Sequence, residues 1–488
     1  MAAGGRTVKL PRAWLLPAVV AALATSASLR AQTPAAASAS PDLSARIARA
    51  ERTLAALTVR AQRVADYDEV RNLQMIYGYY QDKALWDQVV DLFADDATLE
   101  VAQNGVFVGK AAIRNYLLSL TGGKPGLAAG QLNNHLTLSP VITLAEDGTH
   151  AQARWRLLLL DGVWGDASGG NWGSGVYENE YVKHDGVWKI AKLTLSLRFY
   201  APYKGGWTRT TDALTARYGK SSVRPTRASA KQPLWPQRYS APYHYDNPGE
   251  SDYQLARGTS ISSQKAPAAA KSAMDLEART RGLELQMDRL QSANEIENLE
   301  STYGYYADKS QQDAISALFT DSASLEILGR GVFLGGDRVY EYMRRLGTPS
   351  PGQLFNHMQL QPVVHVSDDG ASANIRARLF VMFAQADRAA QWGDGTYENS
   401  FVRENGRWKY QALRGYQGFY ANYDEGWTKH SSGMLSTFPG YPSDLPQSLP
   451  YDAYPASFIA PFHYANPVTG RQEQFSPQRK SMETPGSR

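Results

Sequence analysis

The sequence predicts an α+β fold that is written twice in one chain. Residues 77–83 (YGYYQDK) return as residues 303–309 (YGYYADK), and ten of the eighteen positions in 172–189 are identical in 392–409. Each copy opens with a long helical pattern and ends in a series of longer strands. Helices followed by an antiparallel strand meander are typical of α+β proteins. The copies are about 220 residues long, so they are duplicated domains and not short solenoid repeats.

The first half of each copy is expected to be mainly helical. A long apolar periodicity predicts a first helix over 42–80 and 273–306, and shorter patterns predict a second helix over 84–93 and 310–319. Residues 98–101 (Thr-Leu-Glu-Val) and 105–109 (Gly-Val-Phe-Val-Gly) predict a short strand pair, and the turn region at Gly105, with its counterpart Gly331, suits a hairpin. A third helix follows at 110–120 and 336–346.

The second half of each copy is expected to form long strands. The segments 134–144, 150–160 and 174–184 in the first copy correspond to 356–366, 372–383 and 395–404 in the second. The sequences His-Asp-Gly-Val-Trp and Glu-Asn-Gly-Arg-Trp follow the last of these strands. Asp-Gly and Asn-Gly favour two-residue hairpin turns, so a further strand should pair back at each of these points.

The chain can also be divided by composition. Residues 1–31 contain Arg6, Lys9 and Arg12, then an apolar run and small residues. This is the pattern of a signal peptide, and it predicts export to the periplasm or the medium, with no membrane contact after cleavage. The expected order is a flexible leader (32–41), a first domain with a C-terminal extension (42–255), a linker (256–272), a second domain with its extension (273–467) and a disordered tail (468–488).

Composition excludes several classes of function. The chain has no cysteine, which excludes disulfides, thiolate metal sites and a cysteine nucleophile. It has 51 Lys and Arg against 47 Asp and Glu, without a basic stripe, so nucleic acid is not an expected partner. No metal-ligand spacing, glycine-rich phosphate loop or nucleophile elbow occurs, and we expect neither a metal nor a cofactor.

Several motifs occur in the same order in both copies and resemble a known family. They are Tyr-Gly-Tyr-Tyr-x-Asp, Leu-Phe-x-Asp-x-Ala, Asn-His at a strand start, and Gly-x-Tyr-Glu-Asn followed by Gly-x-Trp-Lys. Each copy resembles the SnoaL-like branch of the nuclear-transport-factor-2-like superfamily. The resemblance implies two tandem cone-shaped α+β barrels, each a curved antiparallel sheet wrapped by helices and preceded by a long helix. The dimer common in that superfamily implies either a homodimer or an intramolecular pairing of the two domains.

The resemblance also implies a catalytic pair in each copy. In scytalone-dehydratase-like enzymes an Asp on the first helix and a His at this strand start move a proton together. Asp82 and His135 match them in the first copy, as Asp308 and His357 do in the second. An Asp–His pair is a minimal acid/base unit, because the carboxylate orients the imidazole and favours its charged form. The same pairs could instead hold helix to strand as buried hydrogen bonds.

The family pattern is incomplete around these pairs. Gln81 and Ala307 replace the family's Tyr, and Tyr80 and Tyr306 lie one residue earlier, where their hydroxyls could stabilise an oxyanion. Residues that could bind a substrate are Tyr77, Lys83, Trp172 and Glu178 in the first copy, and Tyr303, Lys309, Trp392 and Glu398 in the second.

Other residues that recur in both copies can be interpreted in more than one way. Arg154 and Arg156 share one strand face, as Arg376 and Arg378 do. They could bind a carboxylate, lie on the outer face of the sheet, or form salt bridges between the two copies. The repeated His244 and His463 could cap a pocket, or simply pack.

These observations lead to two alternative functions. The first is an exported, cofactor-independent lyase or isomerase that acts on a small aromatic compound. Its reaction would be dehydration, isomerisation or retro-aldol release of an aldehyde such as formaldehyde from a lignin-type aromatic. The second is a non-catalytic binding protein for an apolar small molecule.

Overall fold

The computed structural model describes residues 41–208, 223–237, 239–247, 273–327 and 329–473. Residues Glu51–Arg488 form one compact unit, which contains every strand named below. The described part of Met1–Ala50 is the beginning of the first helix. The expected signal peptide at 1–31 and the linker at 256–272 lie outside the described residues, as do 32–40 of the leader and 474–488 of the tail.

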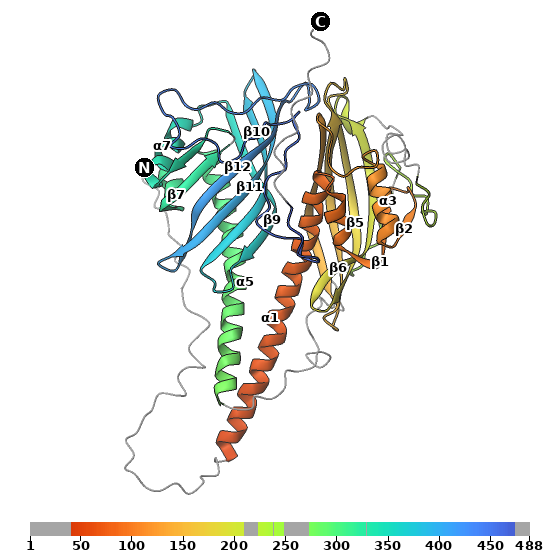
Figure 1. Cartoon of the computed structure of the whole chain (residues 1–488), viewed down its shortest axis with the longest axis vertical. Coiled ribbons are helices and arrows are strands. Elements are labelled where there is room, and N and C mark those ends of the chain that lie inside the picture. The colour runs from red at the N-terminus through yellow and green to blue at the C-terminus, as the bar shows by residue number, and fades with distance from the viewer. Residues whose placement is uncertain (1–40, 209–222, 238, 248–272, 328, 474–488) are drawn as a thin grey trace, which may run out of the picture. The chain divides into compact units, whose positions relative to one another are not determined.

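The two repeats have the same order of elements (Figure 1). Repeat 1 contains α1 (Pro41–Asp82), α2 (Trp86–Asp91), β1 (Phe93–Val101), β2 (Val106–Val108), α3 (Lys110–Ser119), β3 (Gln131–Leu144), β4 (His150–Val163), β5 (Asn171–His184), β6 (Val187–Pro202) and the short 3₁₀ turn η2 (Gly206–Thr208). Repeat 2 contains α5 (Ala273–Asp308), α6 (Gln312–Ser316), β7 (Phe319–Ile327), β8 (Val332–Leu334), α7 (Gly336–Leu346), β9 (Gln353–Val366), β10 (Ser372–Gln385), β11 (Ala389–Glu404) and β12 (Arg407–Asn422). The α+β class and its duplication are therefore confirmed.

Each repeat has one six-stranded mixed sheet. The strand order is β2-β1-β6-β5-β4-β3 in repeat 1 and β8-β7-β12-β11-β10-β9 in repeat 2. The long strands form the expected antiparallel meander, while β1 pairs with β6, and β7 with β12, in parallel. These parallel pairs join strands that are distant in sequence. The expected curved antiparallel sheet is thus formed by the long strands, and each sheet is mixed at one parallel pairing.

The two faces of each sheet have different neighbours. In β4, Ala153, Trp155 and Leu157 belong to the core that also contains residues of α1. Alternate residues point to the opposite face, where Leu160 joins Phe380 of β10 in a second cluster. Residues of both repeats form that cluster, so the faces turned away from the long helices bury apolar surface against each other.

A glycine in each long helix permits close approach to a strand. A Cβ at Gly78 would lie 3.1 Å from the carbonyl oxygen of His135, and one at Gly304 would lie 2.9 Å from that of His357. Both distances are too short for a comfortable contact. The Tyr-Gly-Tyr-Tyr motif therefore places the end of each helix directly beside the start of β3 or β9, and this positions the Asp–His pairs.

The C-terminal extension of repeat 2 returns to repeat 1. The Tyr454 hydroxyl donates to Gly130 O at 3.2 Å, and Gly130 N–H donates to Pro455 O at 2.7 Å. Further along, the Asn466 amide donates to the backbone and side-chain oxygens of Gln88 in α2 at 3.0 and 2.9 Å. The last described residues of the chain thus complete the surface of the first repeat.

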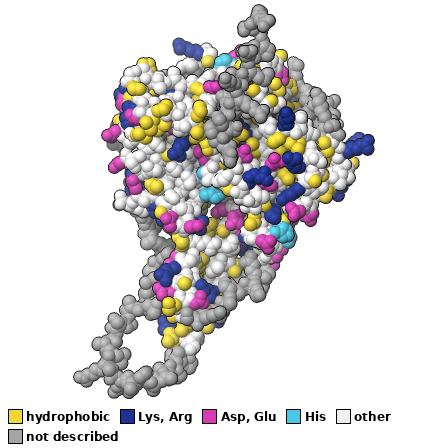
Figure 2. Space-filling model, viewed as in Figure 1, with side chains coloured by type: hydrophobic (Ala, Val, Ile, Leu, Met, Phe, Trp, Pro, Cys, Tyr) yellow, Lys and Arg dark blue, Asp and Glu magenta, His cyan; other side chains and the backbone are white. Residues whose placement is uncertain are grey.

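Basic and acidic side chains are intermixed on the face shown in Figure 2. Among the described helices, none is long and apolar enough to cross a membrane.

Candidate active site

In repeat 2, the expected Asp–His pair is a direct hydrogen-bonded dyad. Asp308 Oδ1 accepts the backbone N–H of His357 at 2.7 Å and lies 2.8 Å from Nδ1 of the same residue. The two side chains are 13% and 20% exposed, respectively. The double contact fixes the orientation of the ring. Because a carboxylate only accepts, Nδ1 is the protonated nitrogen and Nε2 carries the lone pair.

In repeat 1, the corresponding carboxylate is shared with an arginine. Asp82 Oδ1 accepts the backbone N–H of His135 at 2.5 Å, but it lies 4.0 Å from His135 Nδ1. Asp82 Oδ2 accepts from the guanidinium of Arg378, which also donates to Asp394 at 3.0 Å. Asp82 and Arg378 are each 3% exposed. Asp82 therefore neutralises a buried cation from the other repeat, and its distance to the His135 ring nitrogen is longer than the matching 2.8 Å contact of repeat 2.

The surroundings of the two histidines have also diverged. In repeat 2, the rings of His357 and Phe383 are 5.2 Å apart, Phe355 meets Phe383 edge-on at 5.5 Å, and Tyr420 stacks on Phe383 at 6.0 Å. These rings form an aromatic wall beside the dyad.

In repeat 1, Asn133 and Asp161 occupy the positions of Phe355 and Phe383. They lie opposite each other on β3 and β4, and the Tyr200 hydroxyl contacts both Asp161 oxygens at 2.7 and 2.9 Å. This polar group belongs to a pocket of about 270 Å³ whose lining also includes Gln81 and Trp86.

Sequence reasoning did not select Asp161. The signal was present, because an Asp that closes the apolar run Leu157–Leu160 on the buried side of a strand needs a partner. Gln81, noted only as a departure from the family, is 8% exposed, and its side-chain oxygen accepts no hydrogen bond from the described residues.

The predicted tyrosines lie in the cores. Tyr77 packs edge-on against Phe93 and Tyr177, and Tyr303 packs in the same way against Tyr397 and Tyr410. The other two predicted tyrosines are also packed: Tyr80 is 1% exposed, with its ring 5.2 Å from Phe462, and Tyr306 is half-buried against the core of repeat 2.

The predicted lysines and tryptophans lie in different surroundings. Lys83 lines a small space between the repeats together with Asp394 and Arg376, and burial lowers its pKa. Lys309 is exposed. Trp172 and Trp392 meet edge-on at 5.8 Å between the two sheets.

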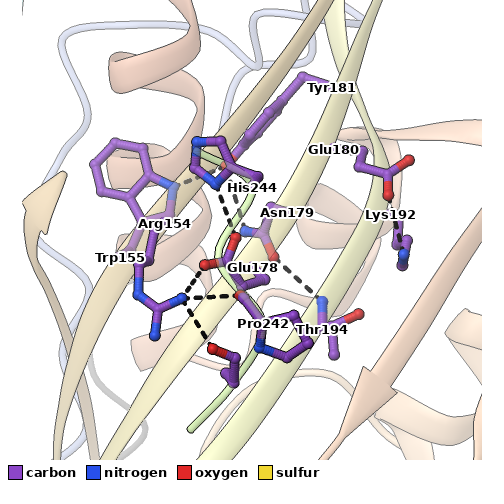
Figure 3. A network of polar contacts seen from close by, with 11 residues as sticks. Arg154, Trp155, Glu178, Asn179, Glu180, Tyr181, Lys192, Thr194, Pro242 and His244 are labelled. Carbon is purple, nitrogen blue, oxygen red and sulfur yellow. Dashed lines mark hydrogen bonds and ion pairs between the residues drawn. The ribbon is translucent and has the colours of Figure 1, made fainter. Parts of the chain in front are cut away.

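The remaining predicted residues, Glu178 and Glu398, form a repeated triad with an arginine and a histidine. Arg154 and Glu178 lie opposite each other on β4 and β5 and are ion-paired. Glu178 Oε2 is 2.9 Å from Nδ1 of His244, and Arg154 donates to Pro242 O at 3.0 Å (Figure 3).

Repeat 2 has the same triad. Arg376 and Glu398 are ion-paired, Glu398 Oε2 is 2.8 Å from Nδ1 of His463, and Arg376 donates to Pro461 O at 2.9 Å. In both repeats the triad attaches the C-terminal extension to the sheet face opposite the core of that repeat. Arg154 and Arg376 pair with glutamates of their own repeat, whereas Arg378 forms the salt bridge between repeats that the sequence left as one alternative.

A further carboxyl group lies in the core of repeat 2. Glu300 in α5 is 2% exposed, and its Oε2 accepts from Asn399 at 2.9 Å and from the Tyr410 hydroxyl at 2.8 Å. Burial raises its pKa from 4.5 to about 7, against the lowering effect of these two hydrogen bonds. The corresponding residue of repeat 1 is Gln74, whose side-chain oxygen also accepts two hydrogen bonds, from Asn179 and from Tyr181 of β5.

Metal ligands do not gather anywhere in the described part of the chain. Over 41–208, 223–237, 239–247, 273–327 and 329–473, no group of three or more His, Asp or Glu side chains is placed to hold an ion.

A family model described as the SnoaL-like domain matches this chain twice, over residues 62–194 and 288–414. The matches cover more than half of the chain and one lies in each repeat, so the protein belongs to the SnoaL-like family with two copies of the domain. The nuclear-transport-factor-2-like fold expected from the sequence is thereby confirmed.

Solved structures resemble a stretch the size of one repeat. A candidate scytalone dehydratase from Novosphingobium aromaticivorans is 19% identical over 28% of this chain and 89% of its own, with a TM-score of 0.26. Hexachlorocyclohexane dehydrochlorinase type 3 from Novosphingobium barchaimii is 20% identical over 28% and 92%, with a TM-score of 0.25. An NTF2-like protein with a cystatin-like fold from N. aromaticivorans is 20% identical over 30% and 90%, with a TM-score of 0.22. No curated protein matches the chain.

Proposed function

We infer that repeat 2 is a cofactor-independent acid/base catalyst acting on a small aromatic compound, as a lyase or isomerase. The observation that carries this proposal is the 2.8 Å contact between Asp308 and His357 on side chains that solvent can reach. Nε2 of His357 is the base. It takes a proton from a C–H or O–H of the substrate, and the Asp308 carboxylate stabilises the imidazolium that forms.

The substrate class follows from the wall beside the dyad. Phe383 lies 5.2 Å from the His357 ring and is flanked by Phe355 and Tyr420. Aromatic side chains favour an aromatic ligand through offset or edge-on contacts. Proton removal from such a compound leads to loss of water, to ring isomerisation, or to retro-aldol release of an aldehyde such as formaldehyde from a lignin-type aromatic.

The contrast between the repeats supports assigning catalysis to repeat 2. A general base needs a positioned partner and access to the substrate. Asp82 is committed to Arg378, and His135 is 3% exposed. We therefore assign the pair of repeat 1 to holding α1 on β3 and to the contact between the repeats. The signal-like N-terminus suggests that this activity is exerted in the periplasm or outside the cell.

The experiment is a product analysis with matched variants. The protein is incubated with aromatic metabolites and lignin-type dimers. The products are separated by chromatography, and their masses are measured by mass spectrometry. Wild type should convert at least one compound, with a mass loss equal to water or formaldehyde, or with a shifted retention time at constant mass. His357→Ala and Asp308→Asn should lose at least a hundredfold in rate, while His135→Ala, if folded, should retain it. Equal loss in the two histidine variants would contradict the assignment.

A second candidate function is binding without catalysis, which the pocket of repeat 1 favours. The pocket has a volume of about 270 Å³, and its lining includes Trp86, Leu127 and Leu132 together with Gln81 and Asp161. It fits a small, largely apolar molecule that carries a hydrogen-bond donor. A ligand recovered unchanged, with an affinity that falls in Asp161→Asn and persists in His357→Ala, would support this function.

A further inference from the structure

A chain of three hydrogen-bonded side chains runs along the outer edge of repeat 2. Glu398 Oε2 contacts His463 Nδ1 at 2.8 Å, and His463 Nε2 contacts Nδ1 of His365 at 2.9 Å. The two imidazole centroids are 5.1 Å apart, so the two nitrogens point almost directly at each other, as in an N–H···N hydrogen bond. We call Glu398, His463 and His365 the imidazole relay.

The hydrogen bonds fix which nitrogens carry protons. Glu398 is ion-paired with the buried Arg376 and is therefore an acceptor. His463 must then donate through Nδ1, and in the neutral form of the ring this leaves a lone pair on its Nε2. His365 donates to that lone pair through its own Nδ1. The one position left for an incoming group is Nε2 of His365, which has a lone pair.

His365 lines a groove outside both Asp–His sites. The groove has a volume of about 480 Å³ and lies between α1, α5 and the end of β9. This volume is in the range of small-molecule pockets. Much of its wall is apolar, with Leu73, Ile76, Leu290 and Val364 among the lining residues.

Charged side chains also line the groove, namely Asp68, Glu69 and Arg289. Arg289 contacts Asp368 at 3.2 Å and the backbone oxygen of Val366 at 3.3 Å. Burial raises the pKa of both acids and lowers the pKa of His365 to about 4. His365 is thus a neutral acceptor over the physiological range.

We propose that this groove binds a small phenol, whose hydroxyl donates its proton to Nε2 of His365. If the proton is transferred, the phenol O–H bond breaks and a bond forms at Nε2. His365 then passes its Nδ1 proton to Nε2 of His463, and the positive charge comes to lie beside the Glu398 carboxylate. The phenolate remains in the groove and no other reactant is needed. The apolar wall contacts the ring.

Repeat 1 supplies the internal comparison. Its triad of Arg154, Glu178 and His244 attaches the extension in the same way (Figure 3). The position that corresponds to His365 is Thr143, so the triad of repeat 1 has no terminal imidazole. Attachment of the extension therefore does not require His365, and its presence in repeat 2 alone points to a separate role.

The relay is tested first without a ligand, by NMR of the full chain with ¹⁵N-labelled histidine. The His365 signals are assigned from their loss in His365→Thr, which introduces the residue of repeat 1. His365 should be protonated at Nδ1 and should stay neutral down to about pH 5, following its pKa of about 4. Protonation at Nε2 instead, or titration near the ordinary histidine value of 6.5, would overturn the relay.

Binding is tested with 4-nitrophenol and its methyl ether, 4-nitroanisole, by calorimetry. The phenol should bind at least tenfold more tightly than the ether, and His365→Thr should weaken phenol binding at least tenfold with no change in affinity for the ether. His244→Ala is the matched control for loss of a triad and should leave both affinities unchanged. Equal affinity for phenol and ether, or an unaltered affinity in His365→Thr, would refute the proposal. The variant His357→Ala should bind the phenol normally, which separates this site from the proposed catalytic one.

Discussion

The buried Glu300 should make repeat 2 less stable as the pH rises, and Glu300→Gln should remove this effect. Glu300 accepts two hydrogen bonds through one oxygen, from Asn399 and Tyr410. The substitution preserves the acceptor, because the equivalent Gln74 of repeat 1 accepts two hydrogen bonds through its own side-chain oxygen. The exchange therefore changes the charge of this position and little else.

The magnitude follows from the shift in pKa. The folded-state pKa is about 7, against an ordinary value of 4.5. Below pH 4.5 the group is protonated in both the folded and the unfolded states and contributes nothing. Between pH 4.5 and 7 the unfolded state loses its proton first, so stability falls as pH rises. Above pH 7 the full cost is present, about 3 kcal/mol at 1.36 kcal/mol for each pKa unit.

The assay is urea denaturation at pH 5 and pH 8, followed by hydrogen exchange of the amides in α5 and β12. Glu300→Gln should resemble wild type at pH 5 and should be more stable by about 3 kcal/mol at pH 8. The reverse substitution in repeat 1, Gln74→Glu, should introduce the same loss of stability at pH 8. If Glu300→Gln keeps the pH dependence of wild type, the reasoning from desolvation is wrong.

Two further substitutions test the packing between the repeats. Arg378→Met should lower the free energy of unfolding, measured by urea denaturation, by about 3–5 kcal/mol, because it leaves the Asp82 carboxylate buried without its cation. A decrease below about 1 kcal/mol would show that the pair is not buried in solution. Gly170→Ala should lower the melting temperature markedly, because the new methyl group would overlap the indole of Trp427 at a backbone φ of +111°. Gly186→Ala, at φ +81° with open space around it, is the control and should show only the smaller cost of backbone strain.

Much of the fold could be predicted from local patterns. The Asp-Gly and Asn-Gly turns set the hairpins of the long strands, and the helical periodicity of α1 and α5 is visible over many turns. The parallel pairing of β1 with β6 could not be predicted. The two strands are separated by most of the domain, and nothing in the sequence of either strand identifies the strand with which it pairs.

The candidate site was predictable only in part. The family resemblance led to the expectation that Asp308 and His357 would meet, and they do. The same motif in repeat 1 gave no sign that Arg378 would take one oxygen of Asp82, since that contact depends on how two domains pack. The attachment of His244 and His463 to glutamates on the sheet was equally hidden, because the path of a proline-rich segment cannot be read from its composition. The catalytic roles of the Asp–His pairs stay predictions.

The return of the C-terminal extension to repeat 1 has a consequence for biogenesis. The backbone oxygen of Gln88 in α2 accepts a hydrogen bond from Asn466, and the backbone of Gly130 forms hydrogen bonds with Tyr454 and Pro455. A chain emerges from the ribosome with its N-terminal domain first, so repeat 1 has to remain with these polar groups exposed until residues 454–466 have been synthesised. Chains truncated before residue 450 should therefore be captured by chaperones or degraded, even though they contain a complete SnoaL-like domain.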